Sequence, residues 1–145
     1  MKRAVFPGSF DPFTTGHYNI VCRGLKLFDE VIIGIGVNGS KQCMLTPDER
    51  LQKIRRTFKN EPRVRVETYD CLTVDFASQH EAQFILRGIR SVKDFEYERE
   101  LADINKKLSG IETILLYSEP EYSSISSSMV RELHKFGKET DEFTI

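Results

Sequence analysis

Five short apolar runs alternate with helical patterns along the chain, and this alternation limits the fold more than any other feature of the sequence. Parallel strands need helical crossovers between them, so such an alternation predicts a parallel sheet with helices on its faces. We therefore expect an α/β protein with a Rossmann-like, doubly wound, five-stranded parallel sheet and right-handed crossovers, as a single domain over residues 1–145. The predicted strands are residues 3–8, 30–37, 63–68, 83–88 and 112–117.

The clearest helical pattern covers residues 94–108, where Tyr97, Leu101, Ile104 and Leu108 form one apolar stripe. The pattern over residues 46–59 opens with a capping box and a proline at its first position, which are typical of a helix start. The other helical patterns cover residues 16–28, 73–80 and 126–136.

Composition narrows the classes of protein to which the chain can belong. The 21 basic residues nearly cancel the 22 acidic ones, which argues against a dedicated nucleic-acid binder but leaves room for a small anionic ligand. Cys22, Cys43 and Cys71 form no CxxC or Cys/His pattern, so we expect reduced thiols rather than disulfides or a zinc site. No run approaches the ~20 apolar residues of a membrane span, so we expect a soluble cytoplasmic protein without a membrane partner.

The first loop that carries unusual residues is "PGSFDPFTTGH", after the first predicted strand. In doubly wound sheets ligands bind beyond the carboxyl ends of the strands, which is where this loop lies. We expect Thr15 to cap the following helix, with Gly16 and His17 in its first turn, where backbone N–H groups favour an anion. An ordinary loop with a surface histidine explains the same composition equally well. The loop is neither a Walker A sequence nor a GxGxxG sequence.

Two later loops carry cations near the same edge of the predicted sheet. Lys41 lies in "NGSKQCML", after the second strand, and a solvated loop lysine is the simpler explanation for any single lysine. Arg87 ends the fourth predicted strand and Arg90 lies in the loop beyond it, and two guanidiniums that flank a glycine suit bidentate phosphate binding. Either arginine alone is also explained by a surface ion pair with Asp94 or Glu96.

A serine-rich stretch, "YSSISSSMVRE", leads into the last predicted helix. Serines at a helix start offer hydroxyls together with unpaired N–H groups, a combination that suits the β- and γ-phosphates of a nucleotide. The alternative is an ordinary serine cap, which helices use often.

Taken together, these segments resemble one enzyme family. "TTGH", residues 14–17, matches the [HT]xGH signature of the nucleotidyltransferase superfamily. With "PGSFDP" before it, and with "LRGIRSVKDFEYE" and "YSSISSSMVRE" after it, the chain resembles the phosphopantetheine adenylyltransferases from Lys2 to about Phe136. The resemblance implies reversible transfer of the adenylyl group of ATP to 4′-phosphopantetheine, which gives dephospho-coenzyme A and pyrophosphate in coenzyme A biosynthesis.

The resemblance also implies the roles of individual residues. His17, Lys41 and Arg90 would be catalytic, with His17 at the α-phosphate. Lys41, Arg87, Thr73 and Ser9 would bind phosphopantetheine, although Thr73 is equally well explained as an ordinary residue at a helix start, and Glu98 as part of a charged helix face. The implied ATP-binding residues are Ser9, Phe10, His17, Gly88, Ile89, Arg90, Glu98, Tyr122, Ser123, Ser124, Ile125, Ser126, Ser127 and Ser128.

The sequence departs from the family pattern in three places. Gly39 and the pair at 42–43 are less familiar residues in the second loop, Tyr122 stands where many relatives have tryptophan, and the tail is short. Because the sequence holds no clustered Asp/Glu motif, we expect Mg²⁺ to be carried mainly by the ATP phosphates. A homohexamer and feedback inhibition by coenzyme A are implied by the resemblance alone.

Two alternatives stay open. The first is another nucleotidyltransferase, which would act on nicotinate mononucleotide or, with CTP, on a polyol phosphate. Cytidylyltransferases are expected to carry an RTxGIST-like final motif, and this chain has "SSISSSMV" instead. The second is a non-catalytic nucleotide-binding module, against which the presence of His17, Lys41, Arg87 and Arg90 together argues.

Overall fold

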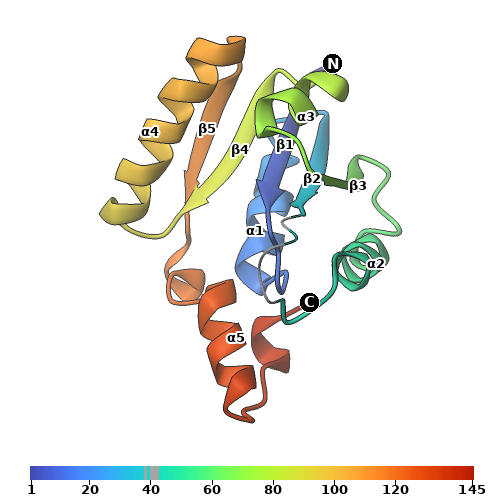
Figure 1. The fold of residues 1–145 in the computed structure, drawn as a ribbon, viewed down its shortest axis with the longest axis vertical. Coiled ribbons are helices and arrows are strands. Elements are labelled where there is room, and N and C mark those ends of the chain that lie inside the picture. Colours follow the sequence, from blue (N-terminus) through green and yellow to red (C-terminus); the bar gives the residue numbers. More distant parts are fainter. Residues whose placement is uncertain (38, 40–42) are drawn as a thin grey trace.

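A computed structural model describes residues 1–37, 39 and 43–145. Within these residues one parallel sheet has the strand order β3-β2-β1-β4-β5, which confirms the predicted doubly wound sheet (Figure 1). Strand β1 lies at its centre, and the chain passes to the other side of β1 after β3. The strands are β1 (Arg3–Gly8), β2 (Glu30–Gly36), β3 (Val64–Tyr69), β4 (Phe84–Ile89) and β5 (Glu112–Tyr117).

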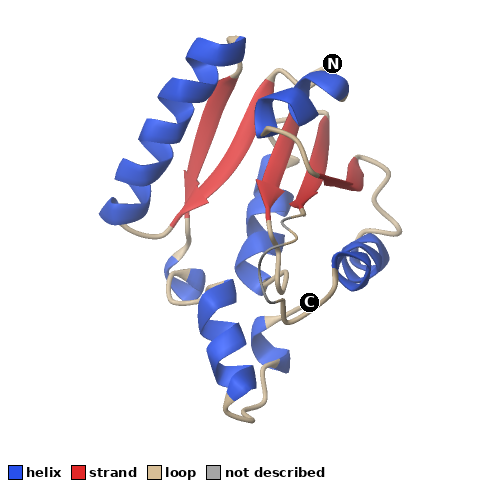
Figure 2. Cartoon of the chain, viewed as in Figure 1, coloured by secondary structure: helices blue, strands red, loops and turns tan. Residues whose placement is uncertain are grey.

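Helices cover both faces of the sheet. The α-helices are α1 (Thr15–Gly24), α2 (Pro47–Thr57), α3 (Thr73–Gln79), α4 (Val92–Ser109) and α5 (Ser127–Lys135). Helices α1 and α2 pack on one face, and α3 and α4 on the other. Figure 2 shows α5 and the last residues of the chain beyond the arrowheads of the strands, and so at the carboxyl edge of the sheet.

The core consists of two apolar clusters, one on each face of the sheet. Phe6, Ile33 and Leu86 pack with residues of α1 and α2, whereas Val5 and Ile85 pack with residues of α3. Successive strand residues point to opposite faces, so strands covered on both faces need apolar residues at consecutive positions. The consecutive apolar residues of the predicted strands therefore reflect two-sided burial.

The start of α1 differs from the prediction by one residue. Thr14, not Thr15, is the N-cap, and its hydroxyl accepts a hydrogen bond from the His17 N–H at 3.3 Å. The Thr15 hydroxyl is buried without a hydrogen-bond partner among the described residues. The capping box closes on Thr14 because His17 stands at the third helical position and its ring binds the Thr14 N–H in return.

Three of the four residues of the apolar stripe on α4 face solvent, whereas Leu101 is half-buried and lines a cavity. Tyr97, Ile104 and Leu108 are 59%, 55% and 62% exposed, and Glu98 is the buried residue of the helix. Strand β5, beneath this helix, is an edge of the sheet with half-buried residues. The chain therefore presents an uncovered apolar face along α4. Among the described helices, none is both long and apolar enough to cross a membrane.

Candidate active site

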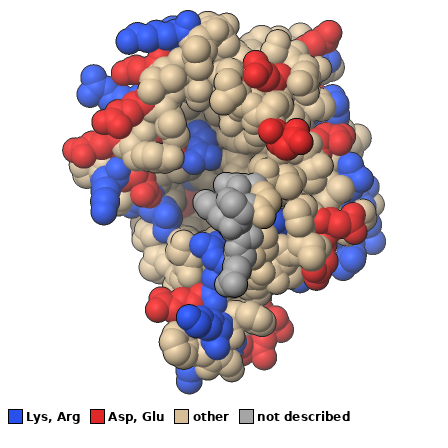
Figure 3. Space-filling view, in the orientation of Figure 1, with Lys and Arg blue, Asp and Glu red and all other residues tan. Residues whose placement is uncertain are grey.

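A cavity of about 380 Å³ opens between the carboxyl halves of β1 and β4, which pair only at Ala4–Phe84 and Val5–Ile85. The loop after β1, the first turn of α1, the end of β4 and the start of α5 form its walls. Figure 3 shows this face of the molecule hollowed, with basic side chains inside the hollow. The predicted site residues that line the cavity are Ser9, Phe10, His17, Arg87, Gly88, Arg90, Glu98, Tyr122, Ile125, Ser126, Ser127 and Ser128.

A few predicted residues lie elsewhere. Ile89, Ser123 and Ser124 do not line the cavity, and both serines are exposed. Thr73 lines a second, adjoining cavity. Lys41 lies outside the described residues.

Hydrogen bonds at the start of α1 fix the tautomer of His17. The backbone N–H of Thr14 donates to His17 Nδ1 at 3.0 Å, and the Thr14 hydroxyl lies 3.1 Å from the same nitrogen. A nitrogen that accepts from a backbone N–H carries no proton, so the neutral ring bears its proton on Nε2. His17 is therefore held as an Nε2–H donor in the wall of the cavity.

The surroundings of His17 also keep the ring neutral. Phe10 meets the imidazole edge to face at 5.0 Å between ring centroids, and Phe13 lies at 5.4 Å. Burial, and then the charges of Arg87 and Arg90, lower the pKa of His17 from 6.5 to about 3. At neutral pH the ring can donate a hydrogen bond but carries no charge of its own.

Arg87 and Glu98 form a bidentate ion pair between the two cavities. Arg87 donates from Nε and Nη2 to the two Glu98 carboxylate oxygens at 2.8 and 2.6 Å. Its Nη1 donates to the Pro7 carbonyl at 2.6 Å, which ties the end of β4 to the end of β1. Hydrogen bonding to Glu98 raises the pKa of Arg87 against the opposing effect of burial. The pair directs the guanidinium of Arg87 toward both cavities.

The start of α5 completes the site and binds the loop after β1. The Ser126 hydroxyl caps the helix by accepting from the Met129 N–H at 3.1 Å. The Ser127 hydroxyl donates to the Pro12 carbonyl at 2.7 Å, so it is already engaged. The N–H groups of Ser127 and Ser128, the first two residues of α5, have no helical acceptors and are available to an anion.

The sequence did not single out Arg131, which brings a third guanidinium to the cavity. Arg131 Nη1 donates to the Asp11 carbonyl at 2.9 Å, and its Nη2 donates to the Ser128 hydroxyl at 3.1 Å. The available signal was its place in the "YSSISSSMVRE" stretch, which is one of the segments that carry the resemblance. With Arg87 and Arg90, it makes the cavity suited to a polyanion.

The second cavity, of about 130 Å³, shares Pro7, Gly8, Arg87 and Glu98 with the first. The Thr73 hydroxyl lies 3.0 Å from the Tyr69 hydroxyl at its wall. A chain-like group could therefore extend from the main cavity past Arg87.

As for metals, the described residues contain no group of three or more His, Cys, Asp or Glu side chains placed to hold an ion.

The cytidylyltransferase-like family matches residues 5–133 of the chain. A curated protein from Phocaeicola vulgatus, named phosphopantetheine adenylyltransferase, is 59% identical over 99% of this chain and 95% of its own length. A curated protein of the same name from Bacteroides fragilis is 58% identical over 99% of this chain and 95% of its own length. Another of that name, from Flavobacterium johnsoniae, is 51% identical over 96% of this chain and 91% of its own length.

Solved structures share the fold at low sequence identity. A bifunctional NMN adenylyltransferase/ADP ribose pyrophosphatase from Francisella tularensis, complexed with AMP and a manganese ion, has a TM-score of 0.69 and 16% identity, over 99% of this chain and 44% of that one. A lipopolysaccharide core biosynthesis protein from Thermoplasma volcanium has a TM-score of 0.59 and 22% identity, over 82% of this chain and 97% of that one.

Proposed function

The chain belongs to the phosphopantetheine adenylyltransferase family, and we propose that its main cavity aligns the two substrates around a neutral His17. The reaction transfers the adenylyl group of ATP to 4′-phosphopantetheine, a step of coenzyme A biosynthesis. An oxygen of the acceptor phosphate forms a bond to the α-phosphorus, and the bond from that phosphorus to the β-phosphate oxygen breaks. Pyrophosphate leaves with the bonding electron pair.

His17 stabilises the α-phosphate as charge shifts during the transfer. The observation that carries this role is the hydrogen bond from the Thr14 N–H to His17 Nδ1, because it leaves Nε2–H as the donor. The acceptor phosphate is already a nucleophile, so the ring needs to move no proton. A fixed donor beside the reacting phosphorus is the kind of preorganised group that stabilises such a transition state.

Arg87, together with Lys41, holds the acceptor phosphate. Arg87 stands between the two cavities, and the second cavity offers Thr73 to the pantetheine arm. Both carboxylate oxygens of Glu98 already bind Arg87. We therefore assign Glu98 to orienting Arg87 rather than to a direct contact with ATP.

ATP occupies the main cavity between the loop after β1 and the start of α5. Arg90 and the first-turn N–H groups at Ser127 and Ser128 hold the leaving pyrophosphate, and Arg90 is catalytic in this sense. Ser9 and Phe10 lie close to both substrates, and Gly88 gives the nucleotide access to the end of β4. Tyr122 and Ile125 flank the nucleotide.

Mg²⁺ accompanies ATP and is held mainly by the phosphate oxygens and water. When bound, it neutralises part of the triphosphate charge. The structural neighbour from Francisella tularensis was crystallised with AMP and a manganese ion.

The assembly is a homo-oligomer, a hexamer by the family resemblance, and it works in the cytoplasm. The exposed apolar stripe of α4 supports self-association, since an uncovered apolar face marks an interaction surface. Coenzyme A acts as a feedback inhibitor because it combines the pantetheine arm with an adenylyl group and so matches both cavities.

Pyrophosphate release tests the reaction. The protein is supplied with ATP and 4′-phosphopantetheine, with ATP and nicotinate mononucleotide, or with CTP and glycerol phosphate. Release only in the first mixture is expected. Faster release in either other mixture would assign the site to a different acceptor, and ATP binding without release in any mixture would indicate a binding module.

A further inference from the structure

Arg50, on α2, is a buried cation that the mechanism above leaves unused. It is 3% exposed and donates from Nη1 to the Ser9 carbonyl at 2.7 Å and from Nε to the Leu45 carbonyl at 3.1 Å. In the described part of the chain, no carboxylate oxygen lies within 4.0 Å of a nitrogen of this guanidinium. Burying a charge without a counter-ion costs free energy, so a buried guanidinium that binds only backbone carbonyls and no carboxylate needs an explanation.

The Ser9–Phe10 peptide connects Arg50 to the catalytic cavity. The carbonyl and the N–H of a trans peptide point in opposite directions. Because Arg50 binds the Ser9 carbonyl from the side of α2, the Phe10 N–H points away from Arg50, and both Ser9 and Phe10 line the main cavity. Among the described residues, none accepts a hydrogen bond from this N–H.

The backbone of Phe10 is held in an unusual conformation. Its φ is +51°, a left-handed value that a bulky residue adopts only where the surrounding structure enforces it. The ring is buried against His17, and Gly8 leaves room for it, since a Cβ there would lie 2.9 Å from Phe10 Cζ. The Arg50 bond to the preceding carbonyl fixes the remaining freedom of this peptide.

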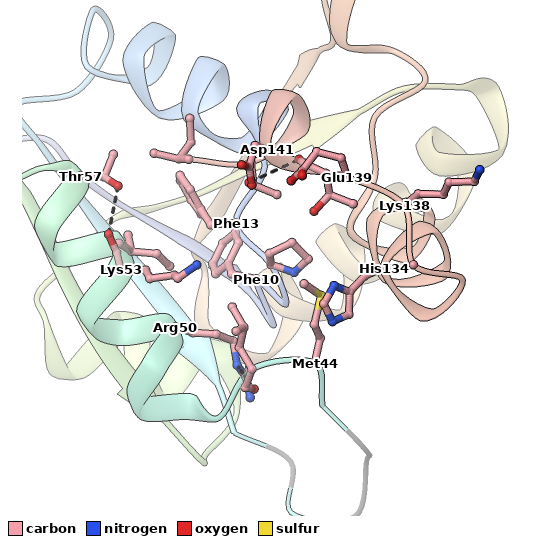
Figure 4. A pocket seen from close by; sticks show the side chains of 17 residues that line it. Phe10, Phe13, Met44, Arg50, Lys53, Thr57, His134, Lys138, Glu139 and Asp141 are labelled. Atoms are coloured by element: carbon pink, nitrogen blue, oxygen red, sulfur yellow. Dashed lines mark hydrogen bonds between the residues drawn. The ribbon is translucent and has the colours of Figure 1, made fainter.

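The same contacts tie the loop after β1 to the segment that precedes α2. The Asp11 carboxylate accepts from the Met44 and Leu45 N–H groups at 2.9 and 2.7 Å, and Arg50 binds the Leu45 carbonyl. Figure 4 shows Arg50 reaching from α2 toward the segment of Met44, in a cavity of about 390 Å³ that Phe10 also lines. Arg50 thus contacts the loop after β1 on the side of α2 and does not line the main cavity.

We propose that Arg50 is a positioning residue for ATP, which fixes the Ser9–Phe10 peptide so that the Phe10 N–H donates to a phosphate oxygen of the nucleotide. The inference rests on the proposed place of ATP beside Ser9 and Phe10. It predicts that Arg50 affects the binding of the phosphates and leaves the binding of the nucleoside unchanged.

Calorimetric titration of the full chain with ATP and, separately, with adenosine tests this. Arg50→Met removes the donors and keeps an apolar stem. ATP affinity should fall by about 10–100-fold, the loss typical of a charge-assisted contact, whereas adenosine affinity should stay close to the wild-type value. Arg55→Met is the matched control, because Arg55 is on the same helix and binds the Val66 carbonyl at 2.9 Å, away from both site cavities. It should change neither affinity.

Arg50→Lys keeps the charge but replaces the guanidinium by a single ammonium group. It provides a second test if circular dichroism shows that the methionine variant is poorly folded. It should weaken ATP binding less than Arg50→Met and leave adenosine unaffected. Equal weakening of ATP and adenosine, or unchanged ATP affinity, overturns the proposal. These titrations need no acceptor. Failure of the wild-type protein to release pyrophosphate would therefore refute the proposed reaction, while the ATP and adenosine affinities would still test the role of Arg50.

Discussion

Arg87 and Glu98 face each other across the boundary of the two cavities and share two hydrogen bonds, of 2.8 and 2.6 Å. A third bond joins Arg87 to the Pro7 carbonyl. A guanidinium has five N–H donors, so two remain on the Nη atoms for a phosphate. The geometry assigns Glu98, 5% exposed, to the orientation of that cation.

Glu98→Gln should therefore raise the KM for 4′-phosphopantetheine by about tenfold and change the KM for ATP much less, because one charge-assisted bond to Arg87 is weakened. Steady-state kinetics with each substrate varied in turn measure the two constants. Glu100→Gln, an exposed neighbour on α4, is the control and should behave as wild type. A rise confined to the KM for ATP would instead restore Glu98 as a direct nucleotide contact.

His17→Ala should lower kcat by a factor on the order of 10²–10³. It should change ATP affinity much less, because the Nε2–H donor is used mainly in the transition state. Single-turnover rates of pyrophosphate formation, compared with ATP binding by calorimetry, separate the two effects. Near-normal turnover in this variant would remove His17 from catalysis.

Burial of neutral His17 should also make the fold less stable in acid. Its pKa is about 3 in the folded chain and 6.5 ordinarily, so between these pH values the unfolded chain binds a proton that the folded chain does not. Stability contributed by this group therefore falls as pH falls through that window, with a slope of at most ~1.4 kcal/mol per pH unit. Urea unfolding of wild type and His17→Gln at several pH values measures the slope. Identical slopes would contradict the assignment.

The exposed stripe on α4 predicts an oligomer that a charge can disrupt. Ile104→Asp combined with Leu108→Asp places two carboxylates on this face, where their burial against a second copy would be costly. Light scattering after size exclusion should show a smaller particle than wild type. Exposed Lys59→Asp, on the opposite side of the sheet near the end of α2, should leave the mass unchanged. A wild-type monomer would contradict self-association through this stripe.

Local sequence patterns were enough to locate the strands. The predicted strand at residues 3–8 coincides with β1, because consecutive apolar residues ended by glycine carry a strong local signal. The same logic brought His17 and Arg87 to one edge, since loops that follow neighbouring parallel strands meet there. The expectation of a nucleotide between them comes from family motifs rather than from local pattern.

What the sequence missed depends on contacts between distant or equivalent residues. Thr14 and Thr15 have the same capping propensity, and only the ring of His17 selects the first of them. In the sequence Glu98 is indistinguishable from its charged neighbours on the helix, and only the contact with Arg87 of β4 sets it apart. Arg50 carries no local signal at all, because its burial arises from the packing of α2 against two loops.

The proposed role of His17 depends on a neutral ring that donates from Nε2, and ¹⁵N NMR of the imidazole nitrogens measures this protonation state. Spectra recorded from about pH 8 down to about pH 4 span the ordinary titration range of histidine. The geometry predicts an unprotonated Nδ1, a protonated Nε2 and no titration of His17 over this range. A proton on Nδ1, or a titration near pH 6.5, would contradict it.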